Sequence, residues 1–384
     1  MKRNDALQTR DRRKLSGCKR RACEKWGGRG SAVKANSILV GHDELGRFIR
    51  DALTSAGARE ADAAVVAEGL VWANLRGGDG HGVSRLPRYL NILAHGEIDV
   101  KAKPRLIHDR GATLVMECDH GFGPVAVMQA AALAVDRARQ LGVCFALIRQ
   151  TTHTGAIGRY AQWIAQHGCA ALILGAGPTL MAFHGARVAS LSTSPIAIAV
   201  PSGNGPILLD MASSAIANGK ILQARNTGEA LPAGTVLTAE GEPTTDAKKA
   251  ETLLPLGGPK GSGLGLMFEM LTSVLAAAPI QARAIGPEKR DRHTGNTALL
   301  AIDIATFRPF ADFTHDADDL AAAIKALPRQ ASFDELTLPG ERSQRTEARR
   351  RKEGIPIPAK LWEELEGIAK KRGLRMPATF PPPR

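Results

Sequence analysis

The chain has 384 residues, of which 44% are hydrophobic and 23% are charged, values typical of a soluble globular protein long enough for two domains. No apolar run reaches the ~20 residues that a membrane-spanning helix needs. Nine of the thirteen net positive charges lie in residues 1–34, so the basic character belongs mainly to an extension and not to the rest of the chain.

Residues 1–36 lack an apolar period and are predicted to form a disordered, basic extension. Such an extension is either an inert solvated segment or a contact for nucleic acid or an anionic membrane surface. It lacks the apolar stretch of a secretory signal. A nucleic-acid-binding protein that uses this extension and the basic residues 342–352 is the alternative class, but an aromatic content of 4% argues against it.

The five cysteines are odd in number and have no C-x-x-C spacing, which argues against a disulfide framework or a zinc site. Cys118, Cys144 and Cys169 lie in apolar surroundings that are typical of buried thiols. A cytoplasmic, reducing compartment fits this pattern best. No two histidines have the spacing of metal ligands on a helix, so no metal is predicted.

The chain after the basic extension is predicted to begin with helices. Apolar residues recur with the period of one helix face over 42–56, 58–75 and 85–94. Gly77-Gly78 ends the second of these helices, so the stretch Gly80–Tyr89 begins in a glycine-rich turn.

From Thr113 the pattern changes to alternating strands and helices. Strands are predicted over 113–117, 143–148, 169–174, 195–200, 207–209 and 298–304, and helices over 124–140, 155–167, 211–222, 264–278, 316–327 and 358–371. Asp316 is the predicted N-cap of its helix, and residues 257–263 are predicted to form a loop. The order of these elements predicts an α/β layered domain.

The stretch Gly80–Tyr89 combines an imidazole with guanidinium groups. His81 can exchange a proton near neutral pH, and Arg85 offers a planar fork of donors that matches a carboxylate. This pair suits a small 2-hydroxy or 2-oxo acid, although an ordinary basic surface loop has the same composition.

Three further polar residues lie where a strand ends or a helix begins. His153 follows a buried strand, where ligands of α/β sheets bind, or it lies in a turn in which Thr154 caps the helix. Asp210 binds a ribose hydroxyl, orients a histidine or caps a helix. Lys260 lies in a glycine cluster before a helix, which is either an anion site or a hinge. No strand is followed by a complete G-x-G-x-x-G loop, so a standard Rossmann site is not predicted.

Six stretches of the chain, taken together and in order, resemble the type-2 malate/L-lactate dehydrogenase family. That family includes ureidoglycolate, sulfolactate and diketogulonate enzymes and reductases of cyclic imino acids such as piperideine-2-carboxylate. The stretches are residues 80–89, 153–155, 194–201, 209–212, 243–246 and 257–264, and the resemblance runs from about residue 38 to 372. Several stretches in one order are far more specific than any single motif.

The resemblance implies an α/β fold with a non-Rossmann, NAD(P)-binding sheet domain over 111–309 and a mainly helical domain formed by both chain ends, 37–110 plus 310–376. It also implies NAD or NADP as cofactor, a small carboxylic acid as substrate and a homodimer. The sequence departs from the family pattern at Gly80, where most members have Ser, and at Pro259, where His or Trp commonly precedes the lysine.

For the site, the resemblance implies His81 as the catalytic acid/base, Arg85 as the group that holds the substrate carboxylate, and His153 as a second histidine that some members use for proton transfer. The implied cofactor contacts are Pro206, Ile207, Leu208, Leu209, Asp210, Met211, Ala212, Pro259, Lys260, Gly340, Glu341 and Arg342. The expected reaction is hydride transfer between NAD(P) and C2 of a small 2-hydroxy or 2-oxo acid, with reduction of a cyclic 2-imino acid as the alternative.

Overall fold

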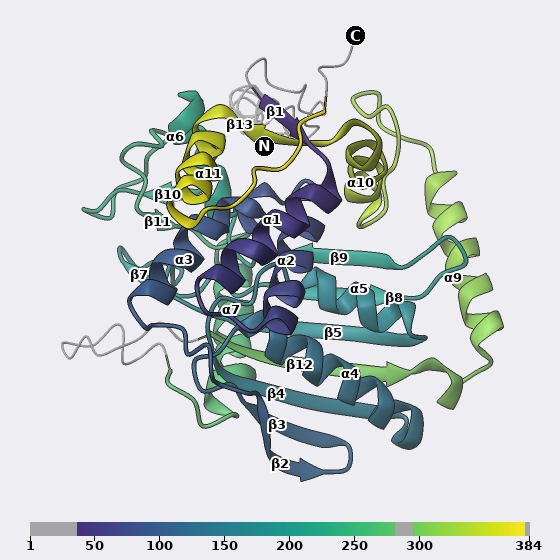
Figure 1. The fold of residues 1–384 in the computed structure, drawn as a ribbon. Helices are drawn as coiled ribbons and strands as arrows, with labels where there is room; N and C mark the ends of the chain where they lie inside the picture. The colour runs from purple at the N-terminus through teal and green to yellow at the C-terminus, as the bar shows by residue number, and fades with distance from the viewer. Residues whose placement is uncertain (1–36, 281–294, 381–384) are drawn as a thin grey trace, which may run out of the picture.

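The computed structural model describes residues 37–280 and 295–380, and the predicted basic extension of residues 1–36 lies outside them. At its centre is a seven-stranded sheet in the order β2-β3-β4-β12-β5-β8-β9 (Figure 1). In that order, the strands span Arg105–Arg110, Thr113–Glu117, Val143–Thr151, Gly295–Asp303, Cys169–Ala176, Ile196–Val200 and Ile207–Met211. β3 and β4 are parallel, and every other neighbouring pair in this sheet is antiparallel.

The central strand β12 is apolar over most of its length because protein covers both its edges and both its faces. It pairs with β4 on one side and β5 on the other, which places Leu299 opposite Ala146 and Ile173. Leu299 is fully buried. By contrast, all six residues of the edge strand β2 are exposed, and its charged side chains discourage pairing with another chain.

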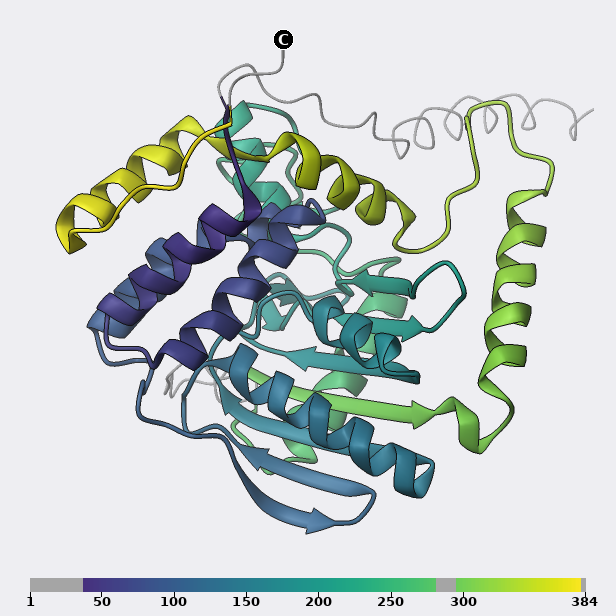
Figure 2. The same ribbon diagram turned by 45° about the vertical axis from the view of Figure 1, so that its right-hand side comes forward.

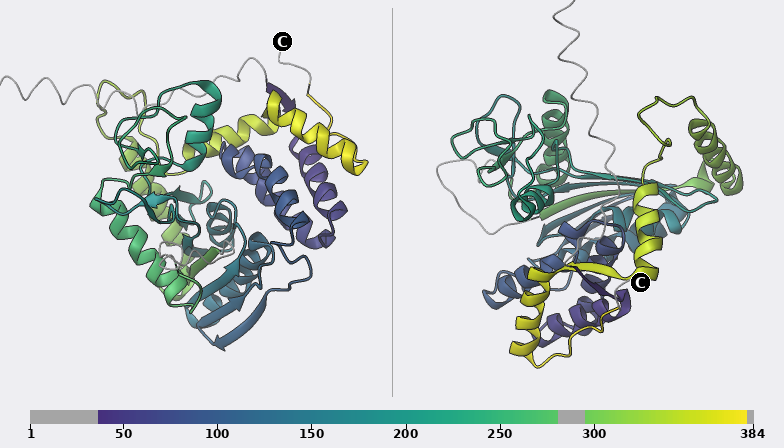
Figure 3. Two further views of the ribbon diagram at one scale, coloured as in Figure 1. Left: turned by 90° about the vertical axis from the view of Figure 1, so that its left-hand side faces the viewer. Right: turned by 90° about the horizontal axis from the view of Figure 1, so that it is seen from above.

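Helices cover both faces of the sheet, as the edge-on view of Figure 3 shows. On one face lie α4 (Gly123–Leu141) and α5 (Gly158–Gln166), whose small residues and Ile164 pack on the central strands. On the other face lie α7 (Pro259–Glu269) and the π-helical turn η3 (Met270–Val274). Phe268 of α7 belongs to a smaller apolar cluster on this face.

A second apolar core joins residues from both ends of the described chain. It lies among α1 (His42–Ser55), α2 (Glu60–Leu75), α3 (Leu86–Ala94) and α11 (Ala359–Arg372). Leu45, Leu70 and Leu365 belong to it. The adjoining strands β1 (Ser37–Val40) and β13 (Ile355–Pro358) pair antiparallel. Because α2 packs against α4, this helical layer lies over the α4 face of the sheet (Figure 2).

The remaining elements form a small sheet and an outer arm. The small sheet has the order β10-β11-β6-β7, and its strands span Val236–Leu237, Thr252–Leu253, Met181–Ala182 and Ala189–Leu191. Its apolar core includes residues of α6 (Asn218–Thr227). The arm consists of η4 (Ile304–Thr306) and α9 (Phe310–Lys325), and it leads to α10 (Glu341–Glu353), which packs against α2 and β13. Figure 2 shows α9 standing at the outer side of the molecule, and none of its residues is buried.

The structure corrects three sequence predictions. Met211 is not helical, because β9 continues through it to pair with Ile196, and α6 begins only at Asn218. The helix predicted from Leu264 begins earlier, at Pro259, since proline suits a first helical turn. Most of the predicted loop over 257–263 is therefore helical.

Asp316 is not the N-cap of its helix. α9 begins at Phe310 with Pro309 in the N-cap position. Asp316 lies inside the helix, where its carboxylate accepts a hydrogen bond from Arg308 Nη1 at 2.8 Å. Asp316 thus forms a surface ion pair inside the helix instead of capping it.

Candidate active site

The predicted catalytic stretch folds as two short 3₁₀ turns between α2 and α3, namely η1 (Asp79–His81) and η2 (Val83–Arg85). The break between them occurs at Gly82, where any side chain would overlap the amide of Asn74. The Asn74 Oδ1 atom accepts the backbone N–H of Val83 at 2.7 Å. This close approach directs the two turns and sets where His81 lies.

His81 and His153 are brought together by the fold. Their rings are parallel, with an interplanar angle of 4° and centroids 5.4 Å apart. Tyr89, on α3, places its hydroxyl 2.7 Å from His153 Nδ1, although the two residues are 64 positions apart in the sequence. The fold therefore brings His81 of η1, Tyr89 of α3 and His153 of the segment after β4 into one cluster of groups that can exchange protons.

The environment keeps His81 neutral near physiological pH. Burial lowers the pKa of His81 to about 4, and the nearby charge of Arg85 lowers it further. Its Nδ1 atom is buried and has no hydrogen-bond partner among the described residues. Burial also raises the pKa of the Tyr89 hydroxyl, so that group stays protonated. His81 is thus able to accept a proton or a hydrogen bond from a bound molecule.

Arg85 is held beside His81 with part of its guanidinium group unused. Its Nε atom donates to the carbonyl oxygen of Gly80 at 2.6 Å. Among residues 37–280 and 295–380, neither terminal nitrogen of Arg85 has a hydrogen bond or an ion pair. The two free nitrogens form the fork that binds a carboxylate.

The segment Pro206–Ala212 lies between the other segments that were expected to contact the cofactor. Near its start, Gln344 Nε2 donates to the carbonyl oxygen of Pro206 at 3.1 Å. A side chain at Gly340 would come within 2.9 Å of the carbonyl oxygen of Leu208, so the segment Gly340–Arg342 passes directly over β9. Just past its end, Ser213 O accepts the backbone N–H of Leu256 at 2.8 Å, which ties the entrance of α7 to β9.

Asp210 contacts the N-terminus of α5, the helix that follows His153 in the chain. Its carboxylate accepts the backbone N–H of Gly158 at 3.1 Å. Desolvation by the surrounding protein raises the pKa of Asp210 to about 6 although the residue keeps an exposed surface, whereas the Gly158 N–H and the positive charge of Arg76 oppose the rise. Asp210 therefore caps a helix that is not the one following it in sequence.

The residues of these segments fit a dinucleotide. Lys260 is exposed in the first turn of α7, and Arg342 is exposed in the first turn of α10. Neither side chain has an ion pair within the described part of the chain. Free cations near β9 suit an anionic diphosphate, and the unpartnered His81 Nδ1 atom suits a polar group of a bound ligand.

The turn that carries His81 packs against α6 through two glycines. A Cβ atom added to Gly80 would lie 3.4 Å from Gly219 Cα, so η1 packs directly on the first turn of α6, downstream of β9. Within the described part of the chain, no hydrogen bond or ion pair joins Arg85 or His81 to Lys260 or to Gly340–Arg342.

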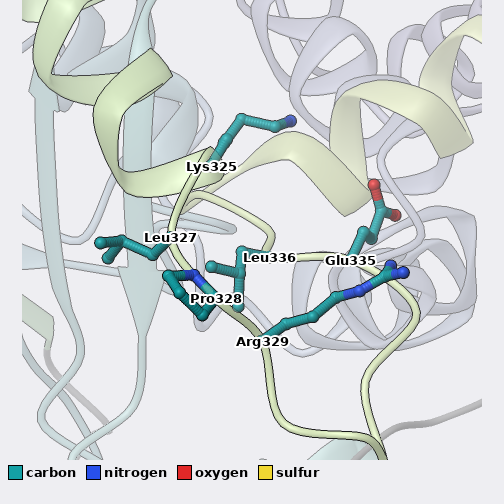
Figure 4. Close-up of a pocket in the computed structure, with 6 residues that line it drawn as sticks. All are labelled: Lys325, Leu327, Pro328, Arg329, Glu335 and Leu336. Atoms are coloured by element: carbon teal, nitrogen blue, oxygen red, sulfur yellow. The ribbon is translucent and has the colours of Figure 1, made fainter.

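A pocket of about 490 Å³ lies between the end of α9 and the segment before α10, and Figure 4 shows the residues that line it. It is lined by Lys325, Leu327, Pro328, Arg329, Glu335 and Leu336. Lys325 and Glu335 are already engaged in ion pairs, with Glu341 and Arg345 respectively. None of the predicted catalytic residues lines this pocket, so it is separate from the histidine pair.

Sequence reasoning did not assign a role to Tyr89, Asn74, Asp79 or Arg350. Tyr89 could have been found, because it lies four residues after Arg85, which is the spacing of one helical turn. Within the described ranges, no group of three or more His, Cys, Asp or Glu residues could hold a metal ion, and no helix is long and apolar enough to span a bilayer.

Comparisons with known proteins agree with this architecture. A family model described as malate/L-lactate dehydrogenase matches residues 40–366. Malate dehydrogenase of Pyrococcus abyssi is 32% identical over 353 residues, which cover 89% of this chain and 97% of that protein. Delta(1)-pyrroline-2-carboxylate reductase of Ancylobacter novellus is 32% identical over 332 residues, which cover 85% and 96% respectively. The solved structure of malate dehydrogenase from Pyrococcus horikoshii matches with a TM-score of 0.82 at 31% identity, covering 90% of this chain and 99% of that one.

The chain belongs to the malate/L-lactate dehydrogenase family. It is accordingly an oxidoreductase of that family, and the resemblance read from six stretches of sequence is confirmed, as is the mixed α/β fold.

Proposed function

We propose that this enzyme transfers a hydride reversibly between NAD or NADP and C2 of a small 2-hydroxy or 2-oxo acid. The observation that carries the proposal is the stacked pair of His81 and His153, with the free fork of Arg85 on the next turn. When bound, the nicotinamide supplies or accepts the hydride. The protein's own groups must then hold the acid and move one proton.

The roles follow from the geometry of each group. Arg85 binds the substrate carboxylate through its two terminal nitrogens, which fixes the orientation of C2. His81 or His153 exchanges a proton with the oxygen on C2, and help of this kind is typically worth ~10²–10⁴-fold in rate. Because His81 is neutral near physiological pH, it is in the form that can accept the hydroxyl proton during oxidation. Tyr89 supports His153 through the hydrogen bond to Nδ1.

The cofactor is proposed to lie along β9 without a Rossmann loop. Pro206–Ala212 would form its central contact, Pro259 and Lys260 a second, and Gly340–Arg342 a third. This placement is supported by the packing of the second and third segments against opposite ends of the first. We assign residues 111–309 to the cofactor-binding domain and 37–110 plus 310–376 to the helical domain.

Reduction of a cyclic 2-imino acid is the second candidate. It is favoured by the similarity to a protein named pyrroline-2-carboxylate reductase. It is also favoured by the neutral state of His81, because a protonated imine carries its own proton and needs less help from a general acid.

We further propose that the enzyme is a cytoplasmic homodimer. Two apolar surfaces support self-association: Leu264, Met267, Leu271 and Leu275 are exposed along α7 and η3, and Leu320 and Ile324 are exposed on α9. Light scattering at several concentrations tests this part. A monomer at every concentration would refute it.

A panel of 2-oxo acids and cyclic imines, each with NADH and NADPH, tests the function through the absorbance of the reduced nicotinamide. We expect turnover with a subset of one class. His81→Ala should lose most of that turnover while still binding the cofactor, as measured by fluorescence. Parent-level turnover in this variant would show that His81 has a different role, and no turnover by the parent enzyme with any substrate would refute the proposed reaction.

A further inference from the structure

The loop that carries His81 is tied to α10 by an ion pair between the half-exposed carboxylate of Asp79 and the buried guanidinium group of Arg350. Arg350 is 7% exposed and donates from Nη1 and Nη2 to the two carboxylate oxygens of Asp79, at 2.6 and 3.0 Å. Its Nη1 atom also donates to the carbonyl oxygen of Asn74. A guanidinium group that binds a carboxylate through two nitrogens has one well-defined orientation, and removing Asp79 would leave the buried charge of Arg350 without its ion-pair partner.

Asp79 and Asn74 together anchor the backbone on both sides of His81. Asn74 Nδ2 donates to Asp79 Oδ1 at 2.7 Å, and Asn74 Oδ1 accepts the N–H of Val83 at 2.7 Å. Position 79 precedes the histidine and position 83 follows it, so the turn is fixed at both ends by one side chain.

His81 depends on these anchors because its own ring has little else to orient it. Its buried Nδ1 atom has no hydrogen-bond partner among the described residues, and the ring contact that the structure shows is the stack on His153. A shift of the turn would therefore move the imidazole directly.

The same helix reaches the segment proposed to bind the cofactor. α10 starts beside Leu208 and contacts Pro206 through Gln344, and further along it accepts a hydrogen bond from Arg76 Nη1 on Glu347 Oε2 at 3.2 Å. α10 thus joins the proposed cofactor contact at its first turn to the histidine turn near its end.

We propose that Arg350 and Asp79 are positioning residues, which hold His81 in register with His153 across from the substrate. This inference rests on the proposed function, since it assumes that the histidine pair transfers the proton. Displacing a reacting group by about 1 Å can lower a rate ~10²-fold. Loss of the pair should therefore lower kcat, with much smaller effects on substrate KM and cofactor binding.

The test compares Arg350→Ala and Arg350→Lys with Arg349→Ala, a control on an exposed neighbour that has no ion pair in the described structure. We expect kcat to fall roughly 10²-fold in Arg350→Ala and less in Arg350→Lys, which keeps the charge but loses the fork. Added ethylguanidinium should restore part of the kcat of Arg350→Ala. The control should keep the parent kcat.

A second readout does not depend on turnover. Diethyl pyrocarbonate modifies accessible imidazoles, and mass spectrometry reports its rate of reaction at His81. We expect faster labelling of His81 in both Arg350 variants, and protection when ethylguanidinium is added to Arg350→Ala.

Unchanged labelling together with parent-like kcat would overturn the inference, and so would a loss of kcat with unchanged labelling and no rescue. If the parent enzyme reduces no substrate in the panel, the proposed function fails, whereas the labelling still decides whether Arg350 positions His81.

Discussion

Acid should destabilise this enzyme through His81, and the size of the effect follows from the structure. Burial lowers the pKa of His81 from the ordinary value of 6.5 to about 4. Between these values the unfolded chain binds a proton at this histidine and the folded chain does not, so stability falls as the pH falls. At about 1.4 kcal/mol per pH unit, this contribution is at most about 3 kcal/mol, and it stops changing below pH 4.

Urea unfolding of the parent enzyme and His81→Gln across this pH range measures the contribution. Relative to the parent, the variant should gain up to about 3 kcal/mol of unfolding free energy between neutral pH and pH 4, because it has no imidazole to protonate. His315→Gln on the exposed helix α9 controls for replacing a histidine. If the difference between the parent and His81→Gln were constant with pH, the folded environment would not hold His81 neutral.

Further substitutions test the other contacts. Arg85→Lys should raise the substrate KM roughly 10–100-fold, because an ammonium cannot replace a bidentate fork, and steady-state kinetics with an unchanged KM would exclude the carboxylate role. Tyr89→Phe should lower kcat roughly fivefold by removing the hydrogen bond to His153, and an unaltered kcat would show that this bond is idle. Gly80→Ser should fold normally, with a change in unfolding free energy below about 1 kcal/mol, since the new Cβ meets α6 at an ordinary 3.4 Å; a large drop in thermal stability would contradict that geometry. Leu299→Ala should cost about 2–5 kcal/mol in urea unfolding, and a smaller loss would mean that β12 is not the centre of the core.

Sequence patterns predicted the long, regular elements well. The strand Thr113–Glu117 has the predicted bounds, and the helix that begins at His42 ends one residue before the predicted end. In both, local periodicity and burial favour the same structure. Where local propensity and strand pairing favour different structures, strand pairing determines the result. Met211 belongs to β9 because it pairs with Ile196, although methionine has a high helical propensity. Strands of two or three residues, as in the small sheet, carry no period that a sequence pattern could show.

The site was predictable only in part for a similar reason. His81 and Arg85 are close in sequence, and residue chemistry alone suggested their pairing. The stack of His81 on His153 depends on how α2 packs against α4 and α5, and no local signal reports that packing. Arg350 looked like one of several basic residues in a charged segment, yet it is the buried one, because Asp79 lies opposite it in the fold.

The place of β12 in the sheet has a consequence for how the protein is made. The ribosome delivers β4 and β5 long before it delivers Gly295–Asp303, and these two strands pair with β12 and not with each other. During translation the nascent chain therefore carries two open, apolar strand edges, and such edges favour aggregation. Chaperone engagement should accordingly persist until the final quarter of the polypeptide has emerged, and a chain truncated before β12 should be insoluble.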